Sequence, residues 1–197
     1  MRLSRPVGFV AAAGLSFAAL AAPIGSAQAA DSYTVTTLHF AVKVGPTNST
    51  KCDIIGDLYV PSAASSTNRV PAILTTNGFG GSKDDQAGIG KAFANRGYVV
   101  LSYSGLGFGG SDCKITLDDP DFDGKAAQQL VGYLGGKAGV AFTDKEHTTA
   151  APVLNVVKKD GLPTANDPRV GMIGGSYGGE VQFAAAGLDK ASTRSCR

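Results

Sequence analysis

The sequence is poor in histidine and carries no run of basic residues. It has two histidines, His39 and His147, in 197 residues. Removal of Arg2 and Arg5 with the leader described below reduces the 18 lysines and arginines to 16, which face 16 acidic residues. A nucleic-acid-binding surface needs clustered lysine and arginine, so we expect no nucleic-acid partner.

A second apolar run of the kind found in membrane segments is also missing. The one such run, 7–22, follows a basic start and precedes the small residues Ala27-Gln28-Ala29. This arrangement is typical of a secretory signal peptide, which we predict over residues 1–29. An uncleaved membrane anchor is the alternative, although the run lies at the short end of the ~20 residues that span a bilayer. We therefore expect a secreted protein that does not contact the membrane after cleavage.

Cysteine is scarce as well, with only Cys52, Cys113 and Cys196. An exported protein meets an oxidising compartment, where Cys52 and Cys113 could form a disulfide and leave Cys196 over. Two free buried thiols are the other reading, and the sequence leaves both open.

Strand and helix patterns alternate along residues 30–190, which we predict to be one domain. Residues 33–44 and 53–60 favour an antiparallel hairpin at a sheet edge, because β-branched and aromatic residues are frequent there. Apolar strands and helices then alternate, with strands at 71–76, 98–103 and 169–173 and helices at 85–96, 123–134 and 180–188. This alternation predicts an α/β fold with a mostly parallel sheet covered on both faces. A short helix is also expected within 153–163.

The pattern Gly174-Gly175-Ser176-Tyr177-Gly178 lies between the last strand and the last helix. In a nucleophile elbow, a serine occupies the apex of a sharp strand-to-helix turn, and glycines let the strand and the helix approach. Ser176 is therefore a candidate nucleophile, and the backbone N–H of Tyr177 is a candidate oxyanion donor. The alternative is a turn without chemistry, since the chain contains 27 glycines.

A second oxyanion donor in such folds comes from the loop after an earlier strand. Here that loop is NGFGG, residues 77–81. The N–H of Phe79 is the first candidate and that of Gly80 the second. The other reading is that these glycines only permit the turn.

Two further patterns lack the context that their ligands need. Residues 105–110 match Gly-x-Gly-x-x-Gly, but no helix is expected to begin there and receive a pyrophosphate. The run Asp118, Asp119, Asp121 and Asp123 does not have calcium-loop spacing. We read it as a solvated loop, with Asp123 capping the next helix, and expect neither a cofactor nor a metal.

A catalytic serine also needs a base and an orienting carboxylate. In folds with this elbow both follow the serine, whereas His39 and His147 precede it. His39 falls in the predicted edge strand, and His147 is read as a surface residue. After Ser176 the acidic residues are Glu180 and Asp189, and there is no histidine.

Three stretches resemble a known family, namely NGFGGSKDD (77–85), GYVVLSYSGLGFGGSDC (97–113) and DPRVGMIGGSYGGEVQFAAAGLDK (167–190). They are similar to the Xaa-Pro dipeptidyl-peptidase and cocaine-esterase-like acyl hydrolases, which have the α/β-hydrolase fold. The resemblance covers about residues 33–190. It implies that Ser176 is the nucleophile, that the loop around Phe79 supports the oxyanion, and that the substrate is a small peptide or an ester. The later strands, acid and histidine of the family are not present.

Residues 191–197 have no apolar pattern. A lost base near the Lys190 codon would account for them, because a shifted frame can read LDKRVDAIVP, in which an apolar strand follows the elbow helix. We therefore predict that 191–197 is a frameshifted tail and that this chain is an inactive fragment of a longer serine hydrolase. The alternative is a non-catalytic secreted protein that uses the same fold as a binding surface.

Overall fold

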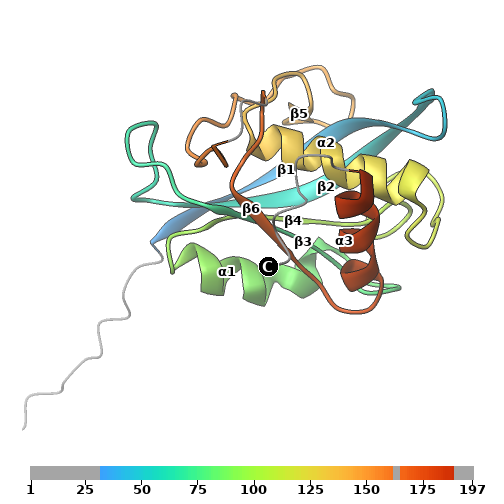
Figure 1. Ribbon diagram of the computed structural model, residues 1–197, viewed down its shortest axis with the longest axis horizontal. Helices are drawn as coiled ribbons and strands as arrows, with labels where there is room; N and C mark the ends of the chain where they lie inside the picture. Colours follow the sequence, from blue (N-terminus) through green and yellow to red (C-terminus); the bar gives the residue numbers. More distant parts are fainter. Residues whose placement is uncertain (1–31, 162–164, 189–197) are drawn as a thin grey trace, which may run out of the picture.

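The computed structural model describes residues 32–161 and 165–188, so the predicted signal peptide and the predicted tail lie outside the described residues. A mixed sheet with the strand order β5-β1-β2-β4-β3-β6 forms its centre (Figure 1). The strands are β1 (Tyr33–Val44), β2 (Thr50–Pro61), β3 (Ala72–Thr76), β4 (Val99–Tyr103), β5 (Ala141–Phe142) and β6 (Val170–Ile173). The helical segments are the 3-10 turn η1 (Lys83–Gln86), α1 (Ala87–Ala94), the π-helical turn η2 (Pro120–Gly124), α2 (Lys125–Leu134) and α3 (Tyr177–Leu188).

The long strands β1 and β2 form the expected antiparallel hairpin, with Phe40 opposite Ile54. Alternate side chains of β1 are buried, namely Leu38, Phe40, Val42 and Val44. The hairpin does not lie at the edge, because β5 pairs with β1 on the outer side. The sequence missed this strand because β5 has only two residues and is held by its pairing rather than by a pattern of its own.

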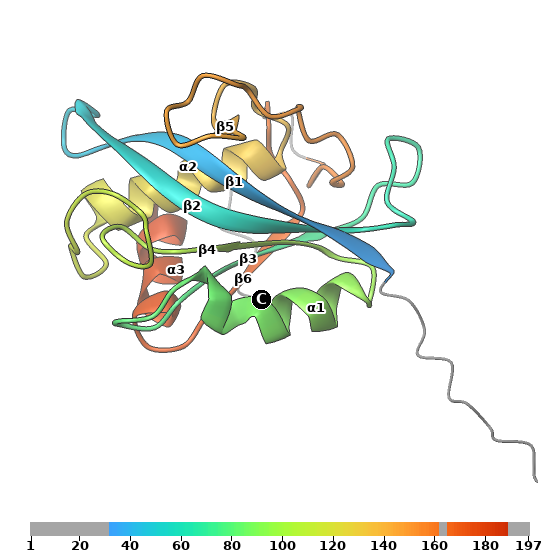
Figure 2. The ribbon, with the colours of Figure 1, turned by 180° about the vertical axis from the view of Figure 1, so that it is seen from behind.

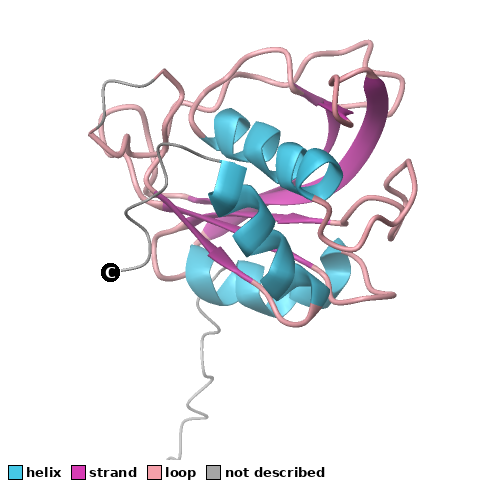
Figure 3. Cartoon of the chain, turned by 45° about the vertical axis from the view of Figure 1, so that its right-hand side comes forward, coloured by secondary structure: helices cyan, strands magenta, loops and turns pink. Residues whose placement is uncertain are grey.

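Strands β3, β4 and β6 form the parallel part of the sheet. β3 and β4 are buried along their whole length, as expected for strands with helices on both faces. On one face Phe93 and Ala94 of α1 pack with Ile73 and Val100. On the other face α2 and α3 cover the larger core (Figures 2 and 3). The predicted α/β fold is therefore confirmed, with a mixed sheet in the described part.

The prediction of a short helix within 153–163 is wrong for the described part of that segment, which contains no helix. Val157 forms a parallel bridge to Val70, and Lys159 forms an antiparallel bridge to Pro168. A few neighbouring apolar residues fit either a helix or extended backbone. The bridge to Val70, more than eighty positions earlier, holds the backbone at Val157 in the extended form.

The helices of the described residues are short, and α3 has 12 residues. Across residues 32–161 and 165–188, none has both the length and the apolar character required to cross a membrane.

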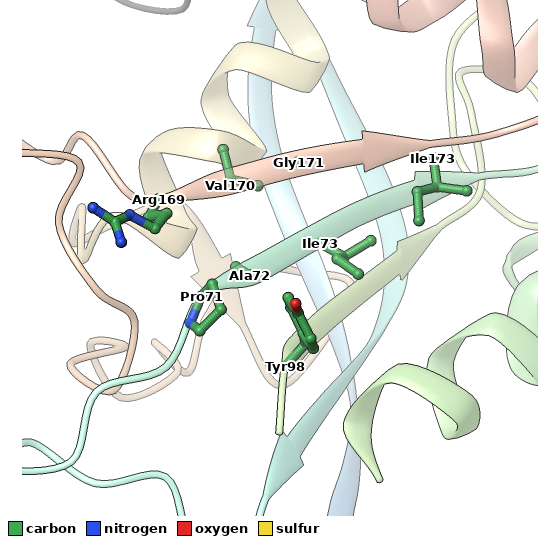
Figure 4. A pocket seen from close by; sticks show the side chains of 8 residues that line it. All are labelled: Pro71, Ala72, Ile73, Tyr98, Arg169, Val170, Gly171 and Ile173. Atoms are coloured by element: carbon green, nitrogen blue, oxygen red, sulfur yellow. The ribbon is translucent and has the colours of Figure 1, made fainter. Parts of the chain in front are cut away.

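Within the described residues, β6 is the last strand of the sheet and pairs only with β3. At this edge, β3 and β6 border an open hollow of about 430 Å³ together with Tyr98 and Arg169 (Figure 4). Ser176 is not one of the residues that line it. The lining residue nearest to the elbow in the sequence is Ile173, the last residue of β6.

Candidate active site

The chain turns sharply between β6 and α3, and Ser176 lies at this turn. Its φ of +53° is in the left-handed region, which costs a non-glycine residue about 1–3 kcal/mol and persists only where the surroundings hold it. The N–H groups of Gly179 and Glu180 donate to the Ser176 carbonyl at 2.7 and 3.0 Å, so α3 begins directly after the serine. Ser176 itself is exposed. The expected strand, corner and helix are all present.

Two glycines allow the strand and the helix to meet so closely. A Cβ on Gly174 would lie 2.4 Å from the Gly178 carbonyl oxygen. A Cβ on Gly178 would lie 2.5 Å from the carbonyl oxygen of Thr76, at the end of β3. Both distances are far below van der Waals contact, and the obstructing atoms belong to the backbone. The glycine pattern in the sequence thus has a steric cause in the structure.

The loop 77–81 lies against the same turn. A Cβ on Gly78 would be 4.0 Å from the Ser176 Cβ and 3.8 Å from the Gly175 carbonyl oxygen. Phe79, the next residue, is exposed. The structure therefore brings the two segments predicted to supply oxyanion donors, 77–81 and the start of α3, to one place.

A buried asparagine holds this loop. The Asn77 side chain accepts a hydrogen bond from the Gly105 N–H (2.9 Å) and donates one to the Gly78 carbonyl (2.7 Å). The ring of Phe79 meets Phe108 edge-on, with ring centroids 5.5 Å apart. The loop after β3 is thus tied to the loop after β4.

Residues 53–194 match the family model of the X-Pro dipeptidyl-peptidases (S15 family). The chain belongs to this family. The match includes the loop 77–81 and the elbow, so the resemblance drawn from the sequence is confirmed. A search of curated proteins gave no match.

Two solved structures share the fold of this S15-family chain. The α/β hydrolase GrgF from Penicillium sp. sh18 is 22% identical, with a TM-score of 0.53, over 80% of this chain and 43% of its own length. A hypothetical protein from Pseudomonas aeruginosa is also 22% identical, with a TM-score of 0.53, over 81% of this chain and 40% of its own length. The chain therefore spans less than half the length of these structures.

Both histidines of this S15-family chain bind one buried aspartate, far from Ser176. His39 Nδ1 and His147 Nε2 each lie 2.8 Å from a carboxylate oxygen of Asp53, which is 3% exposed. His147, read from the sequence as a surface residue, is partly buried, with its side chain 25% exposed, and its ring packs at a tilt against Phe142, with centroids 4.9 Å apart. Four strand spacings separate β1, which carries His39, from β6, roughly 19 Å at the usual spacing. Neither histidine can act as the base for Ser176.

The reading of the acidic run as solvated is wrong for Asp123, and so is its role as a helix cap. Asp123 is 2% exposed, and its carboxylate accepts a hydrogen bond from the Tyr177 hydroxyl at 2.7 Å. The side-chain cap in this region is Asp119, which accepts from the Asp121 N–H. Tyr177 lies 54 positions after Asp123, and no local pattern could have shown this pairing.

Asp118 lies beside the first turn of α3. Burial raises the pKa of its carboxyl to about 7, and the adjacent Glu180 carboxyl contributes through a shared hydrogen bond and through its charge. The charge of Asp123 acts in the same direction. Near neutral pH the Asp118 carboxyl is therefore part-protonated, whereas an exposed aspartate would be fully ionised.

We expect Asp118 to make stability depend on pH in a defined direction. Its pKa is raised in the folded state from 3.8 to about 7, so its stabilising contribution is complete below about pH 4 and is lost as the pH rises through 7. Asp118→Asn should remove this loss, so that the variant gains stability relative to the wild type between pH 4 and pH 7. Urea unfolding at several pH values measures this difference. Glu180→Gln should reduce the same dependence, and a wild-type curve parallel to that of Asp118→Asn would contradict the assignment.

Cys52 and Cys113 form a disulfide, with Cα atoms 5.7 Å apart. It joins β2 to the loop that follows β4. The residues next to it are joined as well, because the Asp112 N–H donates to the Asp53 carbonyl at 2.8 Å. Of the two readings left open by the sequence, the structure contains the disulfide.

The structure also shows the surroundings of the Gly-x-Gly-x-x-Gly match at 105–110 and of the possible metal ligands. The glycines of 105–110 do not open a helix, and a Cβ on Gly105 would lie 2.5 Å from the Tyr177 hydroxyl oxygen. This glycine makes room for the elbow tyrosine. In the part of the chain that the structure describes, no cluster of three or more His, Cys, Asp or Glu residues is arranged to hold a metal ion.

Proposed function

We propose that this chain is the nucleophile-bearing part of a secreted serine hydrolase that cleaves acyl bonds through an acyl-enzyme on Ser176. The observation that carries the proposal is the left-handed Ser176 at the corner between β6 and α3, with Gly174 and Gly178 on either side of it at positions where a Cβ would collide with the backbone. The substrate is a small peptide from which an Xaa-Pro dipeptide is released, or an ester. Membership of the X-Pro dipeptidyl-peptidase family supports this substrate class.

In this mechanism the Ser176 hydroxyl attacks the substrate carbonyl while a base takes its proton. The carbonyl oxygen becomes an oxyanion, which the N–H groups of Tyr177 and Phe79 would bind. Each such donor is worth on the order of 3–4 kcal/mol of the barrier. The amine or alcohol then leaves with a proton, and water hydrolyses the acyl-enzyme. The exposed hydroxyl and the start of α3 beside it support this geometry, because a helix N-terminus favours negative charge.

We further propose that the chain as given is inactive. Both of its histidines are bound to Asp53, several strands away from the elbow. Without a base, Ser176 keeps only the contribution of the oxyanion donors and of binding, about 10³–10⁴-fold over water. The signal-peptide pattern and the disulfide support export, because disulfides persist in oxidising compartments.

The experiment that tests this proposal compares two products of the gene. The chain as given should show no steady hydrolysis of p-nitrophenyl esters or Xaa-Pro-p-nitroanilides. The product of the frame restored after the Lys190 codon should hydrolyse at least one of them, and Ser176→Ala should abolish that activity. Steady turnover by the chain as given, or a restored product unaffected by Ser176→Ala, would overturn the proposal.

A further inference from the structure

Tyr177 is anchored beneath the elbow by its side chain. The residue is 3% exposed, and its ring packs on Phe108 with centroids 5.0 Å apart. Gly105 leaves the space that the phenol occupies, since a Cβ there would lie 2.5 Å from the hydroxyl oxygen. The backbone of Tyr177 thus belongs to the elbow, while its hydroxyl reaches the protein interior.

The Tyr177 hydroxyl donates to the buried carboxylate of Asp123, which also accepts hydrogen bonds from two other protein groups. It donates to Asp123 Oδ1 at 2.7 Å. The other oxygen, Oδ2, accepts from the Thr116 hydroxyl (2.6 Å) and from the Asp118 N–H (3.0 Å). Burial raises the pKa of the Asp123 carboxyl while these three hydrogen bonds lower it. Burial also raises the pKa of the Tyr177 hydroxyl, so the phenol keeps its proton and is the donor.

This bond joins the beginning of α3 to the segment that leads into α2. The two segments touch elsewhere as well, because a Cβ on Gly124 would lie 3.1 Å from the Ala184 carbonyl oxygen and 2.9 Å from Leu188 Cδ1. The elbow needs such support. A left-handed serine is retained only when its neighbours determine its conformation more strongly than its own backbone preference does.

We propose that Asp123 is a positioning residue of the active site: through the Tyr177 hydroxyl it holds the turn at Ser176 and the direction of the Tyr177 N–H. Asp123 does not touch the substrate. The inference rests on the proposed function, in which that N–H binds the oxyanion. Groups of this kind must lie within about 0.5 Å of their productive position, and loss of one oxyanion donor costs about 10²–10³ in rate.

The test uses the full chain and three variants. Asp123→Ala removes the acceptor, and Tyr177→Phe breaks the same bond while keeping the ring and the fold. Thr116→Val is the matched control, since it removes a hydrogen bond from the other oxygen of the same carboxylate and leaves the bond to Tyr177 in place. Amide resonances of Ser176 and Gly178 and the thermal midpoint are measured for each. We expect both bond-breaking variants to shift or broaden these resonances and the control to leave them in place, at a similar loss of stability.

A second measurement separates this inference from the proposed function. Ser176 is labelled with a fluorophosphonate in the presence of added imidazole as a base. Labelling should be about tenfold slower in Tyr177→Phe than in Thr116→Val. This is less than the effect of losing an oxyanion donor completely, because the Tyr177 N–H is displaced and not removed. The role of Asp123 would be overturned if Tyr177→Phe had the same amide resonances and the same labelling rate as the Thr116→Val control. Changed resonances without labelling of Ser176 in any form would leave the Asp123 restraint standing and count against the proposed function.

Discussion

Removal of the Cys52–Cys113 disulfide is expected to lower the free energy of unfolding by about 4 kcal/mol, the loop-closure value for a link of this length. The two cysteines are 61 positions apart, so the bond removes a large part of the freedom of the unfolded chain. A domain of this size has a total stability of only about 5–15 kcal/mol. The double variant Cys52→Ser/Cys113→Ser should therefore unfold at much lower urea concentration, as measured by circular dichroism.

The control for this experiment is Cys196→Ser, which removes a thiol and leaves the pair intact. It should unfold at the same urea concentration as the wild type. Reduction of the wild type should reproduce the double variant. A loss below about 1 kcal/mol in the double variant, less than the range typical of native disulfides, would show that the bond does not stabilise this fold.

Gly178→Ala is expected to destabilise the protein by about 2–3 kcal/mol, because overpacking of this kind costs that much. The added Cβ would lie 2.5 Å from the Thr76 carbonyl oxygen and 2.8 Å from that of Asn77. Both are backbone atoms of β3 and its loop, and they cannot rotate away as a side chain would. The usual gain from replacing glycine in a helix, up to about 1 kcal/mol, offsets only part of this cost.

Gly175→Ala provides the matched control three positions earlier. A Cβ on Gly175 meets no atom within 4 Å, so its free energy of unfolding should stay within about 0.5 kcal/mol of the wild type, as for an ordinary surface substitution. Thermal unfolding of the two variants side by side measures the difference. Equal midpoints would mean that α3 does not approach β3 as closely as the structure has it.

The elbow could be predicted because every part of it is local. The strand, the glycines, Ser176 and the helix follow one another within residues 169–188, and each leaves its own pattern in the sequence. The alternation of apolar strands and helices likewise indicated the α/β fold, because periodicity reports burial directly. The glycines at 174 and 178 were read correctly for the same reason, since steric demands at a tight turn act on the residue itself.

The parts that could not be predicted are those built by distant contacts. Asp123 stood in a run of aspartates that looked solvated, but it is buried and accepts a hydrogen bond from the hydroxyl of the distant Tyr177. His147 looked like a surface residue until Asp53 and Phe142 were seen beside it. Tyr177 lies 54 positions from Asp123 and Asp53 lies 94 positions from His147, and a single sequence has no signal that connects partners so far apart.

The most direct test of the account is the site-resolved reaction of the full chain with a fluorophosphonate, with and without added imidazole, followed by peptide mass spectrometry. The account predicts that Ser176 is labelled at least about tenfold faster than the exposed Ser49 and Ser66 of the same chain, a modest share of what oxyanion donors supply. Imidazole should increase labelling of Ser176 selectively, because both histidines are bound to Asp53, several strands away from it. Equal labelling of the three serines in both conditions would contradict the claim that Ser176 is built as a nucleophile.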